Sequence, residues 1–361
     1  MRVAVITQHG EWSASTRARV LQYVPVLEKH VDTVDVFLAK DRPERRPGRT
    51  GQAVYFAEHA QRYVLRWSEI TRRVTDYDAV LVQRGIYAIG PGAIVRPLEA
   101  FPGRVVYDLD DALLAETPSM QGKGAAAAWL YGPHQVRRLL GRADAIVVST
   151  RTLAQGLPPT TAPVTVLPTV PDVSAYRRAT GGGTPGLIGW AGTTGGLPYL
   201  DPLREVLRRL DESGTARLRV VSSAPWSGPS EFRPWRLDDE PTMFADFAVG
   251  IMPLPDTDYA RAKAGYKLLQ YMAAGVPVVA TAAGAVPEVV GDGAWLVSPG
   301  DGDALAARLS DALAGGASVD ALVGRGRARA SGFSWARCAD GLAGLYRDAV
   351  ASSMAGDRRV R

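Results

Sequence analysis

One stretch in the second half of the chain limits the fold more than any other. Residues 261–292 read RAKAGYKLLQYMAAGVPVVATAAGAVPEVVGD. Apolar residues recur at helical spacing within 268–273. Gly275 and Pro277 then end the helix, because glycine favours the position after a helix and proline cannot continue one. The β-branched run at 276–280 is typical of a buried strand. The stretch therefore predicts a helix followed directly by a strand.

Two lysines stand at the front of this predicted helix. The chain has only five lysines, and Lys263 and Lys267 are two of them. A helix N-terminus presents unpaired N–H groups and a positive dipole end, which together favour phosphate. Gln270 and Tyr271 follow one turn later on the side that Lys267 faces, where an amide can bond to sugar hydroxyls. The pattern fits a diphosphate site, and it also fits a solvated helix start.

Strands and helices alternate along the whole chain. We expect strands at 2–7, 34–38, 77–83, 104–109, 143–149, 164–168, 186–190, 218–222, 247–253 and 276–280. A kinked helix is expected at about 17–29, capped by Ser15 or Thr16. This rhythm predicts an α/β protein with parallel sheets and right-handed crossovers. Ligands of such sheets bind beyond the carboxyl ends of the strands.

The length allows two domains. A chain of 361 residues with 46% hydrophobic residues can fill two cores of ordinary size. A glycine run near residue 182 marks the boundary between them. We predict an N-terminal domain, a linker, a C-terminal domain, a helix that packs back on the first domain and a flexible tail, at 1–170, 171–185, 186–334, 335–352 and 353–361 respectively.

Small and polar residues follow the first predicted strand. His9, Gly10 and Ser15 lie in the loop after it, and Arg17 opens the next helix. Their place at a strand's carboxyl end suits a ligand site. An exposed loop histidine and a solvated arginine fit the same pattern.

A second polar group follows two later strands. Arg84 comes after one strand, and Asp110 and Asp111 come after the next. The carboxylates can bind acceptor hydroxyls or hold structure, with Arg84 as their partner across neighbouring strands. The alternative is a metal site, because the D-x-D within 108–111 resembles the metal motif of the single-domain glycosyltransferase architecture, GT-A.

The loop at 191–196 opens the second half. It is small, polar and followed by a helix, so the amides of Gly192, Thr193 and Thr194 are expected to cradle phosphate.

Composition excludes several classes of protein. The formal net charge of +5 is too diffuse to indicate a nucleic-acid partner. The single cysteine, Cys338, allows no internal disulfide, and the four histidines lack metal-ligand spacing. Glycine and proline break the uncharged stretch 268–287 into pieces too short to cross a membrane. We expect a cytoplasmic protein without stable membrane insertion or bound metal.

A helix at 53–75, rich in arginine and aromatic residues, either touches a membrane surface or a bulky acceptor or presents a solvated face.

The run at 267–292 resembles the donor-nucleotide segment of glycosyltransferase family 4, whose members have two Rossmann-like domains facing across a cleft (the GT-B architecture). MAAGVPVVAT matches the family pattern, and GAVPEVV matches its second part with one extra residue. The two glutamates of the family are replaced by Ala262 and Gln270. A bacterial subgroup with K-x-x-x-K-L-L-Q-Y-M-A-A-G in this place is more similar.

This resemblance implies a retaining glycosyltransferase that moves a sugar from a nucleotide-diphosphate donor to an acceptor hydroxyl. The resemblance also implies an activity that needs no metal and no cofactor besides the donor co-substrate. The acceptor is a small molecule, a lipid or a glycan. The residues implied in catalysis are Lys267, Lys263, His9 and Asp111. Those implied in donor binding are Gly192, Thr193, Thr194, Lys263, Lys267, Gln270 and Tyr271, and those in acceptor binding are Gly10, Ser15, Arg17, Arg84, Asp110 and Asp111.

Other activities use a similar frame. A nucleotide-sugar epimerase or a phosphorylase, an enzyme that couples a nucleotide-activated cyclitol, and a non-catalytic nucleotide-sugar-binding protein all remain alternatives. The replaced glutamates keep the non-catalytic alternative open.

Overall fold

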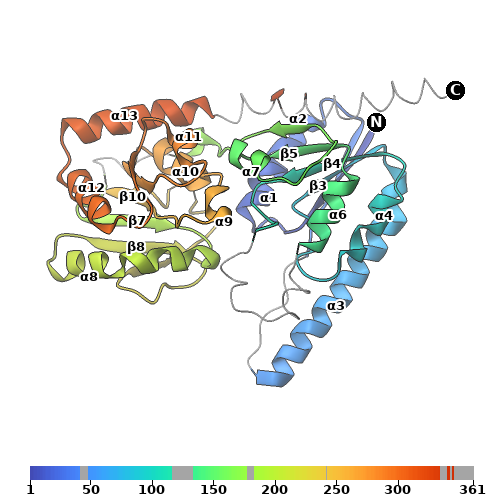
Figure 1. Ribbon diagram of the computed structural model, residues 1–361, viewed down its shortest axis with the longest axis horizontal. Helices are drawn as coiled ribbons and strands as arrows, with labels where there is room; N and C mark the ends of the chain where they lie inside the picture. The colour runs from blue at the N-terminus through green and yellow to red at the C-terminus, as the bar shows by residue number, and fades with distance from the viewer. Residues whose placement is uncertain are drawn as a thin grey trace. The chain divides into compact units, whose positions relative to one another are not determined.

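The computed structural model describes residues 1–40, 48–115, 133–176, 183–240 and 242–333, together with 340, 341 and 344. The chain divides into two compact units (Figure 1). Unit 1 begins at Met1 and its first segment ends at Thr169, and unit 2 begins at Val170. The helix expected at 335–352 and the tail at 353–361 lie outside the described residues, apart from the three single positions.

Unit 1 is built on a six-stranded sheet whose strand order is β2-β1-β3-β4-β5-β6. Every neighbouring pair is parallel. The strands are β1 (Arg2–Thr7), β2 (Thr33–Phe37), β3 (Ala79–Gln83), β4 (Arg104–Leu109), β5 (Ala145–Val148) and β6 (Val164–Val166). The chain leaves β1 toward β2 and then returns to its other side at β3. The strand order therefore reverses between β1 and β3, where ligands bind in open sheets of this kind.

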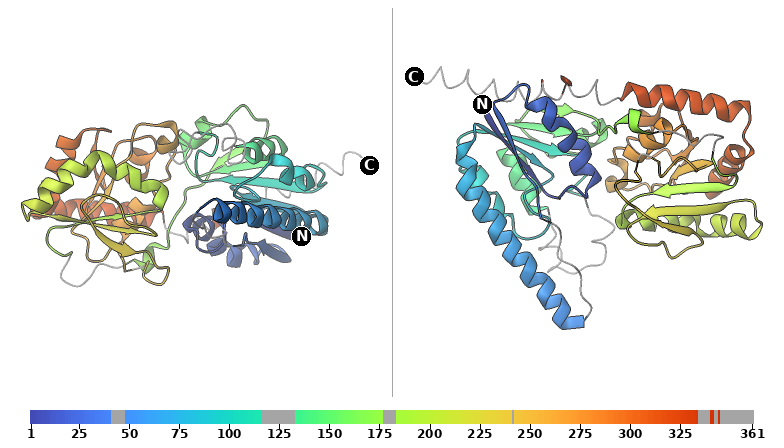
Figure 2. Two further views of the ribbon diagram at one scale, coloured as in Figure 1. Left: turned by 90° about the horizontal axis from the view of Figure 1, so that it is seen from below. Right: turned by 180° about the vertical axis from the view of Figure 1, so that it is seen from behind.

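The helices of unit 1 are mostly short. They are α1 (Ala14–Arg19), η1 (Leu21–Tyr23), α2 (Val24–Leu27), α3 (Gly48–Arg73), η2 (Val74–Asp76), η3 (Gly92–Val95), α4 (Arg96–Glu99), α6 (His134–Arg142) and α7 (Arg151–Gln155). Among the described residues of this unit, only α3 is long, and it projects past the sheet of its unit (Figures 1 and 2).

The single kinked helix expected at 17–29 is wrong. The chain there forms three pieces, because Val20 leaves helical geometry at φ −126° and ψ −70°. Pro25 lies in the first turn of α2, where its missing N–H costs nothing, instead of kinking a longer helix. Ser13, not Ser15 or Thr16, is the residue before α1, and its side chain makes no capping bond.

Unit 2 repeats the arrangement with the order β12-β11-β10-β7-β8-β9. Its pairs are again all parallel. The strands are β7 (Leu187–Ala191), β8 (Arg217–Ser222), β9 (Glu231–Pro234), β10 (Val249–Met252), β11 (Val278–Thr281) and β12 (Trp295–Val297). The order reverses between β7 and β10. The two edge strands, β9 and β12, are short and were not expected from the sequence.

The helices of unit 2 cover both faces of its sheet. They are η4 (Val173–Ala175), η5 (Thr194–Leu203), α8 (Arg204–Glu212), α9 (Asp258–Arg261), α10 (Tyr266–Ala273), α11 (Val286–Val290), α12 (Gly302–Ala314) and α13 (Ala317–Gly332). Alternation along β7 assigns the faces, since successive side chains of a strand point to opposite sides. Ile188 and Trp190 join a core with η5, α8 and α12. Leu187 and Ala191 join one with α10, α11 and α13.

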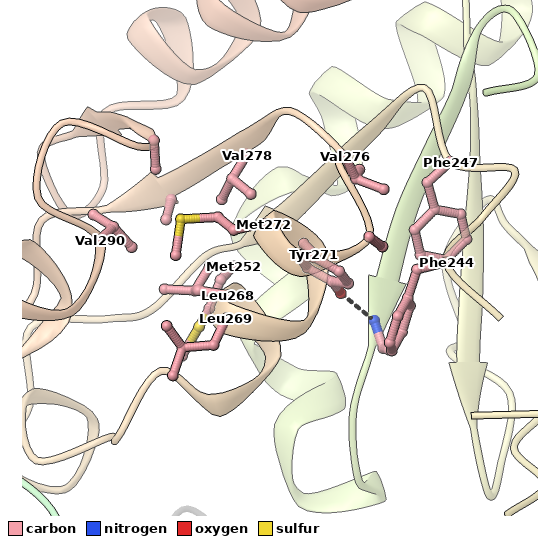
Figure 3. Packing of buried hydrophobic residues seen from close by; sticks show 14 of the residues in the cluster. Phe244, Phe247, Met252, Leu268, Leu269, Tyr271, Met272, Val276, Val278 and Val290 are labelled. Atoms are coloured by element: carbon pink, nitrogen blue, oxygen red, sulfur yellow. Dashed lines mark hydrogen bonds between the residues drawn. The ribbon is translucent and has the colours of Figure 1, made fainter. Parts of the chain in front are cut away.

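Helix α10 packs unusually close to the sheet. A Cβ at Gly250 of β10 would lie 2.6 Å from the Tyr271 ring. The Tyr271 ring also makes an edge contact with Phe244 at 5.1 Å between centroids. Figure 3 shows the apolar side chains of α10 filling this core. A small residue at 250 thus sets how near α10, and the lysine it carries, can approach β10.

Candidate donor site

The candidate site of unit 2 lies where its strand order reverses. The loop after β7 leads into η5, and the chain after β10 leads through α9 into α10. These two connections leave the carboxyl ends of neighbouring strands, which is where open parallel sheets bind ligands. The predicted residues Gly192, Lys263 and Lys267 all belong to them.

Lys267 occupies a confined position at this edge. Its Nζ lies 4.2 Å from the centre of the Trp190 ring, a cation–π distance. A Cβ at Gly192 would lie only 2.9 Å from the same Nζ. Among the described residues no carboxylate forms an ion pair with Lys267. Burial, and secondarily the nearby charge of Lys263, lowers the pKa of Lys267 to about 7. An anion placed here relieves both effects.

The start of α10 adds backbone donors to this cation. Gly265 stands before the helix at φ 64° and offers no capping side chain. The N–H groups of Leu268 and Leu269 bond to the Gly265 carbonyl. The amides of Tyr266 and Lys267 therefore precede the first bond within the helix. An eight-residue helix thus begins beside an ammonium group.

Lys263 lies in a different environment from Lys267, against the side chain of Tyr259. Its Nζ donates to the Tyr259 hydroxyl at 3.2 Å and lies 4.2 Å from the centre of that ring. The backbone N–H of Lys263 bonds to Ala260, which continues the turn of α9. Thr257 caps α9 by accepting from the Ala260 N–H. The connection from α9 to α10 is thereby held at both ends, and it brings the two lysines together.

The loop after β7 is only partly as expected. The Gly192 N–H donates to the Val221 carbonyl at 3.0 Å, so this amide is used by the sheet and cannot cradle phosphate. Thr193 and Thr194 are exposed, and η5 begins at Thr194. Gly192 instead serves as the small residue that lets Trp190 and Lys267 approach each other.

Two predicted donor residues, Gln270 and Tyr271, lie in the interior of unit 2. Tyr271 is fully buried, and its hydroxyl accepts from the Ala191 N–H at 2.8 Å (Figure 3). Gln270 is 5% exposed, and its Nε2 donates to the Tyr176 hydroxyl at 2.6 Å and to Glu240 Oε1 at 2.8 Å. The α10 face that carries them turns toward the core. Gln270 can reach a ribose only if this cluster rearranges.

In unit 1, Arg84 gathers the predicted carboxylates. Its Nη1 donates to Asp110 at 2.6 Å and to Asp111 at 3.0 Å. Arg84 follows β3 with φ 65°, a conformation uncommon outside glycine. The Tyr107 hydroxyl donates to its carbonyl at 2.8 Å and supports this backbone. The cross-strand partnership expected from the sequence is therefore present.

Asp108 lies outside this group. It is buried in a two-pronged pair with Arg19, at 2.7 Å and 2.6 Å. Arg19 also donates to the Leu167 carbonyl and to Thr169. This pair joins α1 to the end of the sheet. Each carboxylate of the D-x-D run thus faces an arginine, and among the described residues no group of three or more His, Cys, Asp or Glu is arranged to hold a metal.

The residues after β1 are held by the protein itself. The His9 carbonyl accepts a hydrogen bond from the Thr7 hydroxyl at 2.7 Å. The centre of the His9 ring lies 5.1 Å from the centre of the Trp12 ring. The Ser15 hydroxyl accepts from the Gln83 amide at 2.5 Å. Arg17 donates to the Glu11 carbonyl. Gly10 is pressed against Ala39, whose carbonyl would lie 3.0 Å from a Cβ there.

Sequence reasoning missed three residues of these sites. Trp190 looked like a strand residue, and Tyr259 and Glu240 lie in segments without a recognisable pattern. Only the fold brings Trp190 under Lys267 and Glu240 beside Gln270. The signal available in the sequence was the run of small residues after Trp190, which allows a close approach to its ring.

A segment that contains this site matches a known family. Residues 203–315 match the model of the family described as glycosyl transferases group 1. The matched segment includes β10, α9, α10 and β11, and therefore Lys263 and Lys267.

Sequence relatives match over a short part of the chain. The O-antigen chain mannosyltransferase B of Escherichia coli is 35% identical over 83 residues, which are 23% of this chain and 22% of that protein. The MMP alpha-(1->4)-mannosyltransferase of Mycolicibacterium hassiacum is 44% identical over 87 residues, 23% of this chain and 21% of that protein. The chain thus matches about a fifth of the length of each of these relatives.

Solved structures match over nearly the whole chain. Sucrose-phosphate synthase of Thermosynechococcus elongatus has a TM-score of 0.67 at 15% identity, covering 98% of this chain and 100% of that one. HepE of Anabaena, in complex with UDP and glucose, has a TM-score of 0.63 at 15% identity, covering 96% and 99%. These likenesses confirm the predicted fold, the two Rossmann-like domains of GT-B.

No described helix combines the length and the apolar character needed to cross a membrane.

Proposed function

We propose that the protein is a metal-independent, retaining glycosyltransferase that binds a nucleotide-diphosphate sugar in unit 2 and transfers the sugar to an acceptor hydroxyl. One observation carries the proposal: the ammonium of Lys267 stands at the open start of α10, beside Lys263, with no carboxylate partner among the described residues. The match over residues 203–315 and the UDP complexes of HepE support a nucleotide ligand.

The reaction breaks the bond between the sugar's anomeric carbon and the diphosphate. The bonding electrons leave with the diphosphate, whose developing charge is stabilised by Lys267, Lys263 and the first amides of α10. The acceptor oxygen forms its bond to the anomeric carbon on the face that the diphosphate leaves. The acceptor proton passes to the departing phosphate, so the step needs no separate base.

The acceptor binds in unit 1 under this proposal. His9, Ser15 and the group formed by Arg84, Asp110 and Asp111 lie where the strand order reverses between β1 and β3. Asp110 and Asp111 retain acceptor oxygens that can bond to sugar or other hydroxyls.

A thermal-shift screen tests the donor site. UDP, GDP, ADP and dTDP and their common sugars, with GDP-mannose and UDP-glucose first, are compared with magnesium and with EDTA. A ligand at about a hundred times its dissociation constant adds about 2.7 kcal/mol of stability. One stabilising nucleotide that is indifferent to EDTA supports the proposal, and no shift with any nucleotide contradicts it.

Product analysis tests the reaction. Incubation of the identified nucleotide sugar with hydroxyl acceptors should release nucleoside diphosphate and give a glycoside with the donor's anomeric configuration, read by NMR. Conversion of the donor sugar without an acceptor would indicate an epimerase instead. Binding without turnover would indicate the non-catalytic alternative.

A further inference from the structure

Helix α3 turns an apolar face to solvent. Of the eight large hydrophobic residues exposed in the part of the chain that the structure describes, four lie on this helix. They are Phe56, Val64, Leu65 and Trp67, with 39%, 58%, 54% and 41% of their surface exposed. A helix that only packs against its own domain turns such residues inward. This concentration indicates a surface that contacts something outside the protein.

Three of the four, Phe56, Val64 and Trp67, belong to one continuous stripe, the outer stripe of α3. Seven exposed positions recur at steps of three and four residues, which places them on one side of a helix: Ala53, Phe56, Ala57, Ala60, Val64, Trp67 and Thr71. All but Thr71 are apolar.

The opposite side of α3 is fastened to unit 1. His59, Arg66 and Ile70 are buried. The Tyr63 hydroxyl donates to the Pro91 carbonyl at 2.8 Å, and Arg66 donates to the carbonyls of Leu38 and Ile86. Tyr63 and Arg66, which the sequence placed among the residues for a membrane or an acceptor, therefore anchor the helix. The inward side is occupied, and the outer stripe is a separate surface.

Arginines outnumber carboxylates on α3, which carries five arginines and two glutamates. The exposed residues Arg49 and Arg72 flank it at its two ends. The two glutamates of α3 fall outside the stripe, and Glu69 is paired with Arg66 at 3.0 Å. Leu65, beside the stripe, also lines a cavity of about 770 Å³ whose charged lining residues are Lys40, Arg62 and Glu11. The apolar surface therefore has an arginine at each end, on a helix with a surplus of positive charge.

This combination favours a lipid surface over a second copy of the chain. An antiparallel pair of these stripes would bring Arg49 of each chain near Arg72 of the other, without a carboxylate in the stripe to offset the repulsion. An apolar stripe that lies at the interface, with arginines reaching lipid phosphates, is the pattern of helices bound in the plane of an anionic membrane. We propose that the outer stripe of α3 seats unit 1 on an anionic membrane surface.

Vesicle flotation of the full chain tests this proposal. The vesicles are an equimolar mixture of phosphatidylglycerol and phosphatidylcholine, compared with phosphatidylcholine alone, at salt concentrations of about 0.05 M and about 0.5 M. We expect binding to the anionic vesicles that weakens at high salt. No binding to either vesicle, or equal binding to both, overturns the proposal.

Matched variants locate the surface. Val64→Glu with Trp67→Glu should lower partition to anionic vesicles at least about tenfold, since two side chains lose apolar burial and two charges are added. Phe232→Glu with Leu237→Glu is the control, because these residues of unit 2 are equally exposed, at 41% and 45%. Equal loss in both pairs contradicts the assignment.

Two further measurements separate this proposal from its rivals. Nucleotide binding by thermal shift should be unchanged in the Val64 and Trp67 variant, so failure of the membrane proposal leaves the proposed transfer activity untouched. Light scattering of the unmodified chain without vesicles should give a monomer. A dimer that the same two substitutions dissociate would assign the stripe to a second copy instead.

Discussion

At the scale of single residues, the site of unit 2 depends on a cation placed where charge is costly. Lys267 is packed between Trp190 and Gly192, and Lys263 adds repulsion. A free ammonium in such a place loses part of its hydration without gaining a carboxylate. The diphosphate of a donor would supply the missing negative charge. The desolvation and repulsion that disfavour the Lys267 ammonium in the free protein would then be relieved on binding, which strengthens binding of the ligand.

Removing this cation should weaken donor binding. Lys267→Met keeps the length of the side chain and removes its charge. We expect affinity for the nucleotide sugar to fall roughly 10- to 100-fold, the ~1.5–3 kcal/mol typical of a hydrogen bond to a charged group. Titration calorimetry measures it, and an unchanged affinity would remove Lys267 from the site. Lys29→Met, far from α10 in sequence and in the other unit, is the control.

Donor affinity should depend on pH through the same group. The pKa of Lys267 in the free protein is about 7, and a bound diphosphate raises it. Below pH 7 the free and bound states are both protonated. Above pH 7 binding takes up a proton, so affinity falls with rising pH, by up to about tenfold per unit. Calorimetry of a nucleotide sugar in buffers of different ionisation enthalpy should show this uptake, and Lys267→Met should abolish it.

Arg84 should matter for stability as well as for the acceptor site. Arg84→Met leaves Asp110 and Asp111, which are 9% and 17% exposed, without their shared partner. Breaking a buried pair of this kind costs about 3–5 kcal/mol. The control is Arg138→Met, whose pair with Glu99 is 35% exposed on both sides and should contribute about 1 kcal/mol or less. Denaturant unfolding measures both, and similar losses would contradict the ranking.

At the scale of elements, α10 joins the core of unit 2 to its ligand edge. Its inner face packs Leu268, Leu269 and Met272 against the sheet, while its first turn opens toward Lys263. Gly265 makes this possible, because the chain turns at φ 64° between α9 and α10. Burial of one face thus fixes the position of the donors at the helix start.

Substitution of the turn glycine tests this link. Gly265→Ala forces a side chain into the left-handed region and should destabilise the protein by roughly 1–2 kcal/mol, with weaker nucleotide binding. Gly324→Ala, within α13 and with open space around the added Cβ, should instead stabilise it by about 0.5–1 kcal/mol. Chemical denaturation distinguishes them, and a neutral Gly265→Ala would show that α10 starts independently of this turn.

At the scale of the whole molecule, the chain builds two separate parallel sheets, and each reverses its strand order once. Ligand-bearing loops gather at that reversal because the loops after the two central strands run in opposite directions along the sheet. Unit 2 carries Lys263 and Lys267, and unit 1 carries Arg84 with Asp110 and Asp111.

The two units should therefore respond differently to a donor. Hydrogen exchange with and without the identified nucleotide sugar should show protection gained at the start of α10 and at η5 in unit 2. The central strands β1 and β3 of unit 1 should change much less when no acceptor is present. Equal protection of both units by the donor alone would contradict a donor site confined to unit 2.

The sequence by itself determined the alternation of strands and helices, the two-domain organisation it implies, and the segment around Lys267, because these follow from local periodicity and turn residues. It also indicated the partnership of Arg84 with Asp110 and Asp111, since parallel strands end at one edge. Only the tertiary structure decided that Tyr271 and Gln270 face inward. It also decided that the Gly192 N–H bonds to the Val221 carbonyl, and that Trp190 lies against Lys267. It also decided which side of α3 is exposed. Periodicity shows that a helix has two faces, but the packing of distant segments determines which face is buried and which polar atoms remain available to a ligand.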